Sequence, residues 1–328
     1  MRRIIAFALA LLLFAGAAPA RAEAVKQSAV GYYLDTVITL TCWVEDPAVL
    51  DEALEECGRY EALLSRTKEG SDVWRINHAE GQPVTVSDDT IRVLEEARSV
   101  SELSGGLFDV TIGQVTVLWD FRSGEAVLPD AEELARAAAL CDWRQVQIDG
   151  NTVTVPAGCM IDLGGIAKGY IADAVRQFLK DRGVTRGILS FGGNIVTIGT
   201  KEGGAPWKIG LQDIDGQPGE SMGRIACARE ASFVTSGIYE RGFEVDGVFY
   251  HHILDPATGW PVQNELAAVT VITTESIRGD ALSTALFALG LDRGLALAEE
   301  LPDTEAVFIT RNRQFRWTSG AEGMVEIN

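Results

Sequence analysis

The sequence predicts an α+β fold in which mixed or antiparallel sheets are flanked by helices. Residues 46–181 hold most of the segments with a helical spacing of apolar residues, whereas residues 187–273 are rich in short β-branched stretches. Helices and strands are therefore partly segregated along the chain, which favours α+β over a doubly wound sheet. The 328 residues and 47% hydrophobic content are sufficient for a substantial core.

The first half of the chain is predicted to be mainly helical. Alternation and β-branching predict a strand over 31–43. Apolar spacing with polar residues at the helix starts predicts helices over 46–64, 71–76, 90–104 and 130–140. The tripeptide Asp149-Gly150-Asn151 predicts a hairpin that joins strands 145–148 and 152–155.

The second half is predicted to be mainly strands. A helix ends near Asp181 and is followed by strands over 187–191, 195–200, 207–211, 223–228, 232–235, 243–245, 248–252 and 267–273. A helix over 280–300 and a hairpin of strands 307–309 and 315–318 complete the chain. We see no repeat and no internal linker, so residues 23–328 are predicted to form one functional domain.

Residues 1–22 have the pattern of a signal peptide. Arg2 and Arg3 precede the apolar run 4–15, and Ala20-Arg21-Ala22 offers a cleavage site. The run is short for a membrane span, which needs about 20 residues. We therefore expect an extracytoplasmic protein, in the periplasm or at the outer face of the cell membrane, with an uncleaved anchor as the alternative.

Charge and cysteine content exclude several classes of partner and site. The net charge of −19 argues against nucleic acid and anionic membranes. The five cysteines are widely spaced and include no Cys-x-x-Cys pair, so a zinc or redox motif is not indicated. We expect buried free thiols, with one or two disulfides as the alternative outside the cytoplasm.

The stretch from Asp162 to Asp173 is the strongest candidate for ligand binding. A carboxylate leads, Gly164-Gly165 follows, Lys168 adds a cation, and a helical pattern then begins. A strand end, a tight glycine turn and a helix N-terminus would present backbone N–H groups and positive charge to phosphate. The alternative is a structural strand-to-helix turn, because short glycine motifs are not specific.

Three further clusters carry polar chemistry. Thr235 to Arg241 is a polar turn after an apolar strand. Residues 250–261 hold two of the three histidines, His251 and His252, of which at most one should face a given site, and Asp255 lies close enough to orient one. Asp280 and Thr284 share one face at a helix start and suit a hard cation such as Mg²⁺, although for this cluster alone an Asp near the N-cap and a Thr bonded within the helix is the better explanation. Together these clusters supply a phosphate turn, a base and metal ligands, which suits attack on a phosphoanhydride.

Five ordered motifs resemble the ApbE family of FAD:protein FMN transferases. They are Asp162 to Tyr170, Gly192 to Ile195, Thr235 to Arg241, His252 to Pro261 and Asp280 to Thr284. The resemblance also covers Arg75 to Asn77 and Phe108 to Gly113, and spans roughly residues 30–320. It implies an ApbE-like fold and an enzyme that splits FAD with Mg²⁺, joins FMN to a Ser or Thr of an acceptor flavoprotein through a phosphoester, and releases AMP.

The resemblance also assigns roles to individual residues. Asp280 and Thr284 would bind Mg²⁺ through their side chains and Gly165 through its carbonyl. His252 would be the base, and Asp255 would support it. The residues that would contact FAD are Leu34, Thr67, Phe108, Asp109, Asp162 and Lys168. Asn77 would lie near the metal and the phosphates.

The chain departs from the family pattern in three places. Leu34-Asp35-Thr36 stands where the family often has Met-Gly-Thr, and Gln114 stands where proline is common. Many family members are lipoproteins, but this chain lacks the cysteine near residue 22 that would carry the lipid. The resemblance implies acceptors of the Rnf or NADH:quinone reductase type, and through them proximity to a membrane. The alternatives are an FAD pyrophosphatase that yields FMN and AMP, and a non-catalytic flavin-binding envelope protein.

Overall fold

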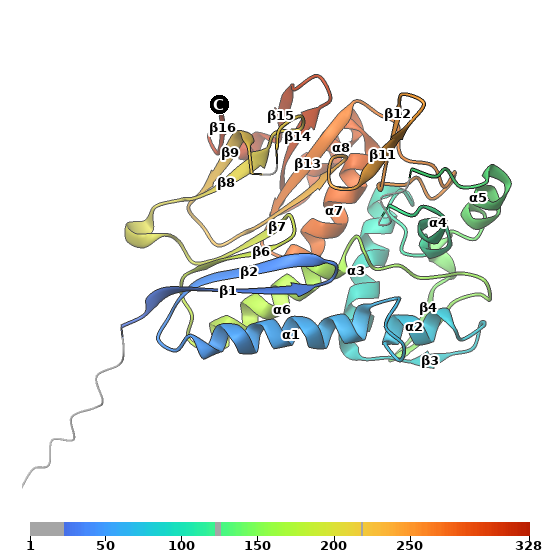
Figure 1. The fold of residues 1–328 in the computed structure, drawn as a ribbon, viewed down its shortest axis with the longest axis horizontal. Coiled ribbons are helices and arrows are strands. Elements are labelled where there is room, and N and C mark those ends of the chain that lie inside the picture. The colour runs from blue at the N-terminus through green and yellow to red at the C-terminus, as the bar shows by residue number, and fades with distance from the viewer. Residues whose placement is uncertain (1–22, 122–125, 218) are drawn as a thin grey trace, which may run out of the picture.

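A large antiparallel sheet organises the molecule (Figure 1). A computed structural model describes residues 23–121, 126–217 and 219–328. In the order in which they pair across this eight-stranded sheet, its strands are β1 (Val25–Tyr33), β2 (Thr36–Val44), β6 (Gly187–Phe191), β7 (Asn194–Ile198), β10 (Ser232–Gly237), β13 (Leu266–Thr273), β14 (Glu305–Thr310) and β15 (Phe315–Trp317). Every neighbouring pair is antiparallel, in keeping with the predicted α+β class.

Helices cover one face of this sheet, which we call the inner face. They are α1 (Ala48–Leu64), α3 (Asp88–Ser104), α6 (Ala167–Asp181), α7 (Ser276–Leu289) and α8 (Leu291–Glu300). In α6, the buried residues Ile171, Val175 and Leu179 recur at helical spacing and contribute to the same core as Phe191 of the sheet. Burial of these stripes places α6 and α7 side by side.

A small second sheet covers the opposite, outer face. Its strands pair in the order β16 (Val325–Ile327), β9 (Ser221–Cys227) and β8 (Trp207–Gln212). Trp207, Ile225 and Phe233 belong to the core between the two sheets. Strand β13 is consequently buried along its whole length, which explains its nearly continuous apolar sequence.

Smaller elements surround the edge of the large sheet. They are α2 (Asp72–Asn77), α4 (Gly113–Leu118), α5 (Ala131–Ala138), and the pairs of strands β3 (Val84–Thr85) with β5 (Thr152–Thr154), β4 (Gln147–Asp149) with β5, and β11 (Gly242–Val245) with β12 (Val248–His251). The predicted hairpin at Asp149-Gly150-Asn151 is confirmed. An aromatic cluster that includes Trp119, Phe243 and Tyr250 packs α4 against the β11–β12 hairpin.

The predicted single strand over 31–43 is wrong, because the chain reverses within it. Strands β1 and β2 form a hairpin whose loop is Leu34-Asp35. Both loop residues adopt left-handed backbone angles, with φ of 55° and 56°. Turns of this kind normally contain Asn or Gly, so no turn signal marks these two positions. A branched side chain in this conformation is strained, and the surrounding structure must hold it.

Two further boundaries differ from the prediction. The helix expected over 280–300 is two helices, because Gly290 has a φ of 78° that ends α7 and precedes α8. Helix α7 also begins at Ser276, so Asp280 lies one turn inside the helix and not at its cap. The strand expected before Asp162 is only an isolated bridge between Ile112 and Met160.

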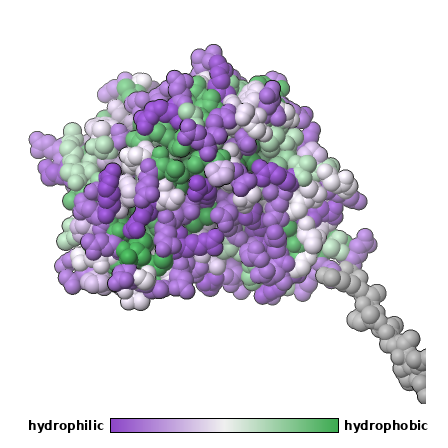
Figure 2. Space-filling model, turned by 180° about the vertical axis from the view of Figure 1, so that it is seen from behind, coloured by the Kyte–Doolittle hydropathy of each residue, from purple (hydrophilic) through white to green (hydrophobic). Residues whose placement is uncertain are grey.

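The five cysteines are free, and all except the half-buried Cys141 are buried, as expected. Desolvation raises the pKa of the Cys42 and Cys57 thiols to about 12, so neither is a reactive thiolate. Hydrophilic side chains cover most of the face in Figure 2, with a few hydrophobic patches between them. Within the described ranges, no helix is long and apolar enough to cross a membrane. The predicted signal peptide, residues 1–22, lies outside those ranges.

Candidate functional site

The glycine turn before α6 is held from behind by Asn77. The Asn77 side chain accepts a hydrogen bond from the backbone N–H of Ile161 at 2.7 Å and donates to its carbonyl at 2.9 Å. These two bonds fix the backbone directly before Asp162. The side chain that was expected near the metal and phosphates therefore acts on the backbone of the turn.

The Asp162 carboxylate joins three parts of the chain. It accepts the N–H of Gly164 at 2.8 Å and the hydroxyl of Thr116 at 2.8 Å. Its second oxygen also pairs with the Arg66 guanidinium at 2.9 Å. The turn is thereby fixed to α4 and to the loop after α1. Arg66, which the sequence reasoning missed, brings a second cation to the neighbourhood of Lys168.

Helices α6 and α7 meet where Lys168 and Asp280 lie. One Asp280 oxygen accepts the Gly169 N–H at 2.8 Å, and the other lies 3.9 Å from the Lys168 ammonium. A Cβ at Gly169 would lie 2.2 Å from the Ser276 carbonyl oxygen, so only glycine permits this approach. The close crossing of the two helices is what places the carboxylate beside the glycine turn.

Oxygen atoms converge around Thr284. A Cβ added at Gly165 would lie 3.7 Å from the Thr284 hydroxyl and 3.2 Å from the Phe108 ring. The Thr284 hydroxyl also lies 3.2 Å from that of Ser236, which in turn bonds Ser283 at 2.8 Å. The predicted residues Gly165, Phe108 and Thr284 are therefore neighbours. Ser236 of β10 adds a hydroxyl, and although it lies in the selected cluster Thr235 to Arg241, sequence reasoning assigned it no individual role.

Leu34 and Thr67 lie in two loops that Glu61 links. The backbone N–H of Leu34 donates to the Glu61 carboxylate at 2.9 Å, and the second oxygen of Glu61 pairs with Lys68. Thr67 is exposed in the same loop, next to Arg66. Glu61, near the end of α1, thus ties the tip of the β1–β2 hairpin to the loop that also reaches Asp162.

His252 is half-buried and neutral. Its Nδ1 lies 3.2 Å from the Arg241 carbonyl oxygen, which can only accept, so Nδ1 carries the proton and Nε2 keeps a free electron pair. Burial, followed by the positive charges of Arg241 and Lys168, lowers the pKa of His252 to about 3. The ring is therefore in the form that accepts a proton at neutral pH.

The adjacent His251 has a structural role. It is fully buried, its Nε2 donates to the Val262 carbonyl at 3.0 Å, and its Nδ1 accepts the Ile253 N–H at 3.3 Å. Both ring nitrogens are engaged, and the ring meets Phe287 edge to face. The two histidines thus point to different surroundings, as strand alternation predicts.

Burial of His251 makes stability depend on pH. Desolvation lowers the pKa of His251 to about 4, so between about pH 6.5 and 4 the unfolded chain binds a proton that the folded chain does not. We expect this group to lower the free energy of unfolding by about 1.4 kcal/mol per pH unit as pH falls through that window. Urea unfolding at pH 7.5, 6.0 and 5.0 should show a smaller pH dependence for His251→Gln than for the wild type. Equal slopes would contradict the assignment.

The carboxylates of Asp109 and Asp255 are engaged in local turns. Asp109 is buried and accepts hydrogen bonds from Thr111 N–H at 2.8 Å and Trp143 N–H at 3.0 Å, and desolvation raises its pKa. Asp255 accepts the Ala257 N–H at 2.9 Å and closes the turn after His252. The structure therefore shows both residues shaping the backbone beside the site.

Glu240 and Asn194 are further polar groups at this site. A Cβ at Gly193 would lie 3.7 Å from a Glu240 oxygen. Desolvation raises the pKa of Glu240 to about 7, with Asp280 acting in the same direction and Lys168 opposing it. The amide nitrogen of Asn194 is buried without a hydrogen-bond partner among the described residues. Both residues lie inside motifs that the sequence analysis selected, but motif position alone gave neither a role.

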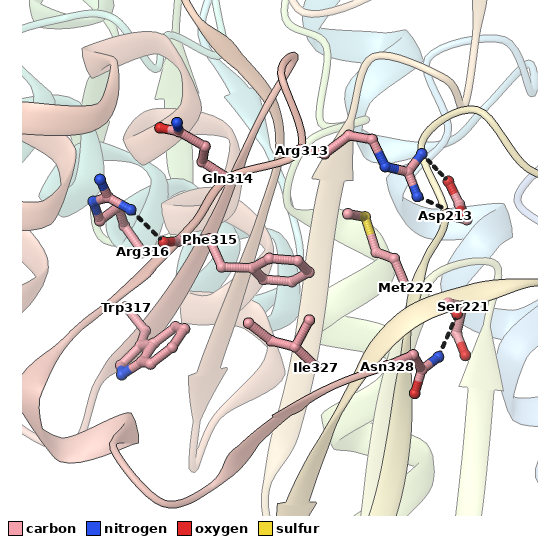
Figure 3. Close-up of a pocket in the computed structure, with 10 residues that line it drawn as sticks. All are labelled: Asp213, Ser221, Met222, Arg313, Gln314, Phe315, Arg316, Trp317, Ile327 and Asn328. Carbon is pink, nitrogen blue, oxygen red and sulfur yellow. Dashed lines mark hydrogen bonds and ion pairs between the residues drawn. The ribbon is translucent and has the colours of Figure 1, made fainter.

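The cavity of about 580 Å³ shown in Figure 3 is elsewhere. Its lining includes Met222, Phe315 and Ile327, whose side chains point toward one another, while Arg313 points to Asp213 at its rim. Met222 and Phe315 belong to the core on the outer face of the large sheet, whereas Lys168 and Asp280 lie on α6 and α7 at the inner face. The cavity contains none of the predicted site residues.

Several known proteins are similar to this chain in sequence or in fold. The chain is 38% identical to an FAD:protein FMN transferase of Klebsiella pneumoniae over 84% of this chain and 86% of that protein. It is 33% identical to one of Treponema pallidum over 97% and 93%. The crystal structure of the ApbE protein of Thermotoga maritima superposes with a TM-score of 0.83 at 32% identity, covering 92% of this chain and 99% of that one. Residues 34–308 match the profile of the ApbE family, and the chain belongs to this family.

Proposed function

We propose that this protein is an FAD:protein FMN transferase. The observation that carries the proposal is the convergence of Lys168, Asp280, Thr284 and the Gly164-Gly165 turn at the crossing of α6 and α7. Cations and backbone groups suit a diphosphate, and His252 lies close enough for the charge of Lys168 to affect its pKa. The named activity of the relatives in Klebsiella and Treponema supports the same assignment.

The donor set fits Mg²⁺. One Asp280 oxygen is not used by the Gly169 hydrogen bond, and the Thr284 hydroxyl and the Gly165 backbone lie beside each other. Such hard oxygen ligands suit Mg²⁺. The described residues contain no cluster of three or more His, Cys, Asp or Glu side chains that would hold a metal alone. We therefore infer that Asp280, Thr284 and Gly165 would hold the ion.

The reaction that follows is transfer of FMN to a hydroxyl. When bound, Mg²⁺ would stabilise the charge that develops on the phosphates. Nε2 of His252 takes the proton of the acceptor Ser or Thr hydroxyl. The new bond joins that hydroxyl oxygen to the FMN phosphorus, and the bond to the bridging oxygen breaks, so that AMP leaves. Lys168 stabilises negative charge at the same place.

Residues 34, 67, 108 and 162 are proposed to contact FAD. Phe108 lies beside Gly165, and Asp162 orients the turn. Glu61 links Leu34 to the loop that contains Thr67, and Arg66 of that loop pairs with Asp162. Asp109 and Asp255 are proposed to act mainly through backbone geometry, by shaping the segments that carry Phe108 and His252.

We propose that the protein acts outside the cytoplasm on acceptor flavoproteins of the Rnf or NADH:quinone reductase type. The signal-peptide pattern of residues 1–22 supports the location. The acceptor class rests on the family resemblance. Membrane proximity would then come from the acceptor.

Mass spectrometry of an acceptor tests the proposal. A peptide or domain with a Ser/Thr-Gly-Ala-Ser/Thr stretch is incubated with the protein, FAD and Mg²⁺. A mass gain of FMN minus water that requires Mg²⁺ is expected. Free FMN and AMP with an unmodified acceptor would favour a pyrophosphatase. Retained FAD without any product would favour a non-catalytic flavin-binding protein.

A further inference from the structure

One face of the β1–β2 hairpin is apolar and exposed. Val30, Tyr32 and Val37 are 65%, 68% and 54% exposed. Tyr32 lies opposite Val37 and Val30 opposite Thr39 in the antiparallel register, so the four side chains share one face, which we call the hairpin face. The Ser28–Thr41 hydrogen bond at 2.9 Å continues the same face along the hairpin. The apolar side chains are thus contiguous.

The two faces of this hairpin have different surroundings. On the inner face, a Cβ at Gly31 would lie 3.1 Å from Leu54, and one at Gly58 would lie 3.0 Å from Tyr33, so α1 covers the strands closely. On the outer face, the small sheet approaches the hairpin near its far end, where the ring centroids of Trp207 and Trp43 are 6.4 Å apart. Among the described residues, the end of the outer face near the loop therefore stays uncovered.

Strand β1 also presents an open backbone edge. It pairs with β2 on one side, and no described strand pairs with its other side. With a two-residue loop, Tyr33 and Thr36 form the first hydrogen-bonded pair, so the N–H and C=O groups of Val30 and Tyr32 point to the open edge. Exposed edges are usually protected by charge or proline. Residues 27–33 contain neither.

The loop end of the hairpin lies on the same side of the sheet as the candidate active site, as Thr36 of β2 shows. Thr36 is so close to Gly192 that a Cβ added at Gly192 would clash with the Thr36 hydroxyl. Gly193, which follows Gly192, lies beside the Glu240 carboxylate. The charges of Lys168 and Asp280 both act on Glu240. A segment laid along β1 toward the loop would thus run toward the end of the sheet at which the candidate site lies.

The chemistry of the hairpin face selects the kind of partner. The chain has a net charge of −19, yet the hairpin face holds no carboxylate and consists of valine, tyrosine and threonine. Depletion of charge and the presence of tyrosine are typical of the centre of a protein interface. An uncharged, extended protein segment matches this face better than a basic one.

We propose that the acceptor protein docks by adding an extended segment along β1, with apolar side chains on the hairpin face and its target Ser or Thr beyond the hairpin loop. This inference rests on the proposed transferase function. Backbone pairing would provide affinity, and the hairpin face would provide selectivity for the folded acceptor.

The test compares two variants and two acceptors. Val30→Lys/Tyr32→Lys changes only exposed side chains, and Val25→Lys is the matched control, because Val25 is 51% exposed at the far end of β1. The acceptors are the folded flavin-acceptor domain of an Rnf-type complex and a short peptide that carries its target residue. Circular dichroism and thermal unfolding check that each variant is folded.

For the folded domain, we expect the double variant to raise KM about tenfold or more with kcat little changed, as for loss of interface anchors. The double variant should release AMP without an acceptor at the wild-type rate. The Val25→Lys variant should have the wild-type KM and kcat for the folded domain. Unchanged KM in the double variant would overturn the proposal. The proposal would also be overturned if the wild-type protein were a dimer and the double variant a monomer, because a second copy of the chain would then occupy the hairpin face. Wild-type protein that modifies no acceptor would refute the transferase function, and the docking proposal with it.

Discussion

Asp280→Asn should abolish FMN transfer while leaving the protein folded. The asparagine keeps an oxygen for the Gly169 N–H, which Asp280 accepts at 2.8 Å, but it removes the charge proposed to hold Mg²⁺. A metal contributes several kcal/mol to stabilisation of the transition state, so we expect a loss of about 10³-fold or more. FMN transfer and AMP release are measured across a Mg²⁺ titration.

Ser283→Ala is the matched control for this prediction. Ser283 neighbours Thr284 on α7 and bonds Ser236, but it is not a proposed ligand. The transfer rate of Ser283→Ala should stay within about tenfold of the wild-type rate, because the variant loses a single hydrogen bond that contributes about 1 kcal/mol. Wild-type rates in Asp280→Asn at limiting Mg²⁺ would remove this residue from the proposed metal site.

His252→Ala should slow transfer by about 10²–10⁴-fold and spare FAD binding, as expected for loss of a general base. The Arg241 carbonyl fixes the proton on Nδ1, and the lowered pKa keeps Nε2 unprotonated at neutral pH. Single-turnover transfer and FAD titration separate the two effects. Because the folded enzyme keeps the His252 ring neutral between pH 8 and 6, protonation of His252 should not lower the transfer rate in this range.

His78 provides the control for the His252→Ala prediction. His78 is exposed and stacks on Trp74 at 4.1 Å, so His78→Ala should transfer FMN at the wild-type rate. A normal rate for His252→Ala would move the base elsewhere. Glu240, with a pKa of about 7 beside the same centre, would then be examined before Asp255, whose carboxylate is occupied by Ala257 N–H.

The sequence predicted the fold class and most elements, because their apolar periodicity is strong. The β1–β2 hairpin escaped detection because its turn, Leu34-Asp35, contains neither Asn nor Gly. Helices α7 and α8 were merged because apolar residues continue across Gly290, and only the positive φ of that residue separates them. Local patterns report propensity, whereas these two breaks depend on backbone conformation.

The site was predicted unevenly for a similar reason. Motif order located Gly165, Lys168, Asp280 and Thr284, and the structure brings them together through the close approach at Gly169. The contacts of Arg66, Asn77 and Glu240 depend on residues distant in sequence, such as the 84-residue separation of Asn77 and Ile161. Such pairings leave no pattern in a single sequence.

The pairing of β2 with β6 has a consequence for how the chain folds. The hairpin forms from neighbouring residues, but its partner strand is more than a hundred residues later. Closing so long a loop is entropically costly, and folds rich in such contacts fold slowly. The hairpin loop that contains Leu34 can take its place in the sheet beside Lys168 and Asp280 only after this late step. Recovery of FAD binding during refolding should therefore lag behind recovery of helical circular dichroism, and removal of the N-terminal hairpin would leave a chain whose remaining motifs cannot form a complete site.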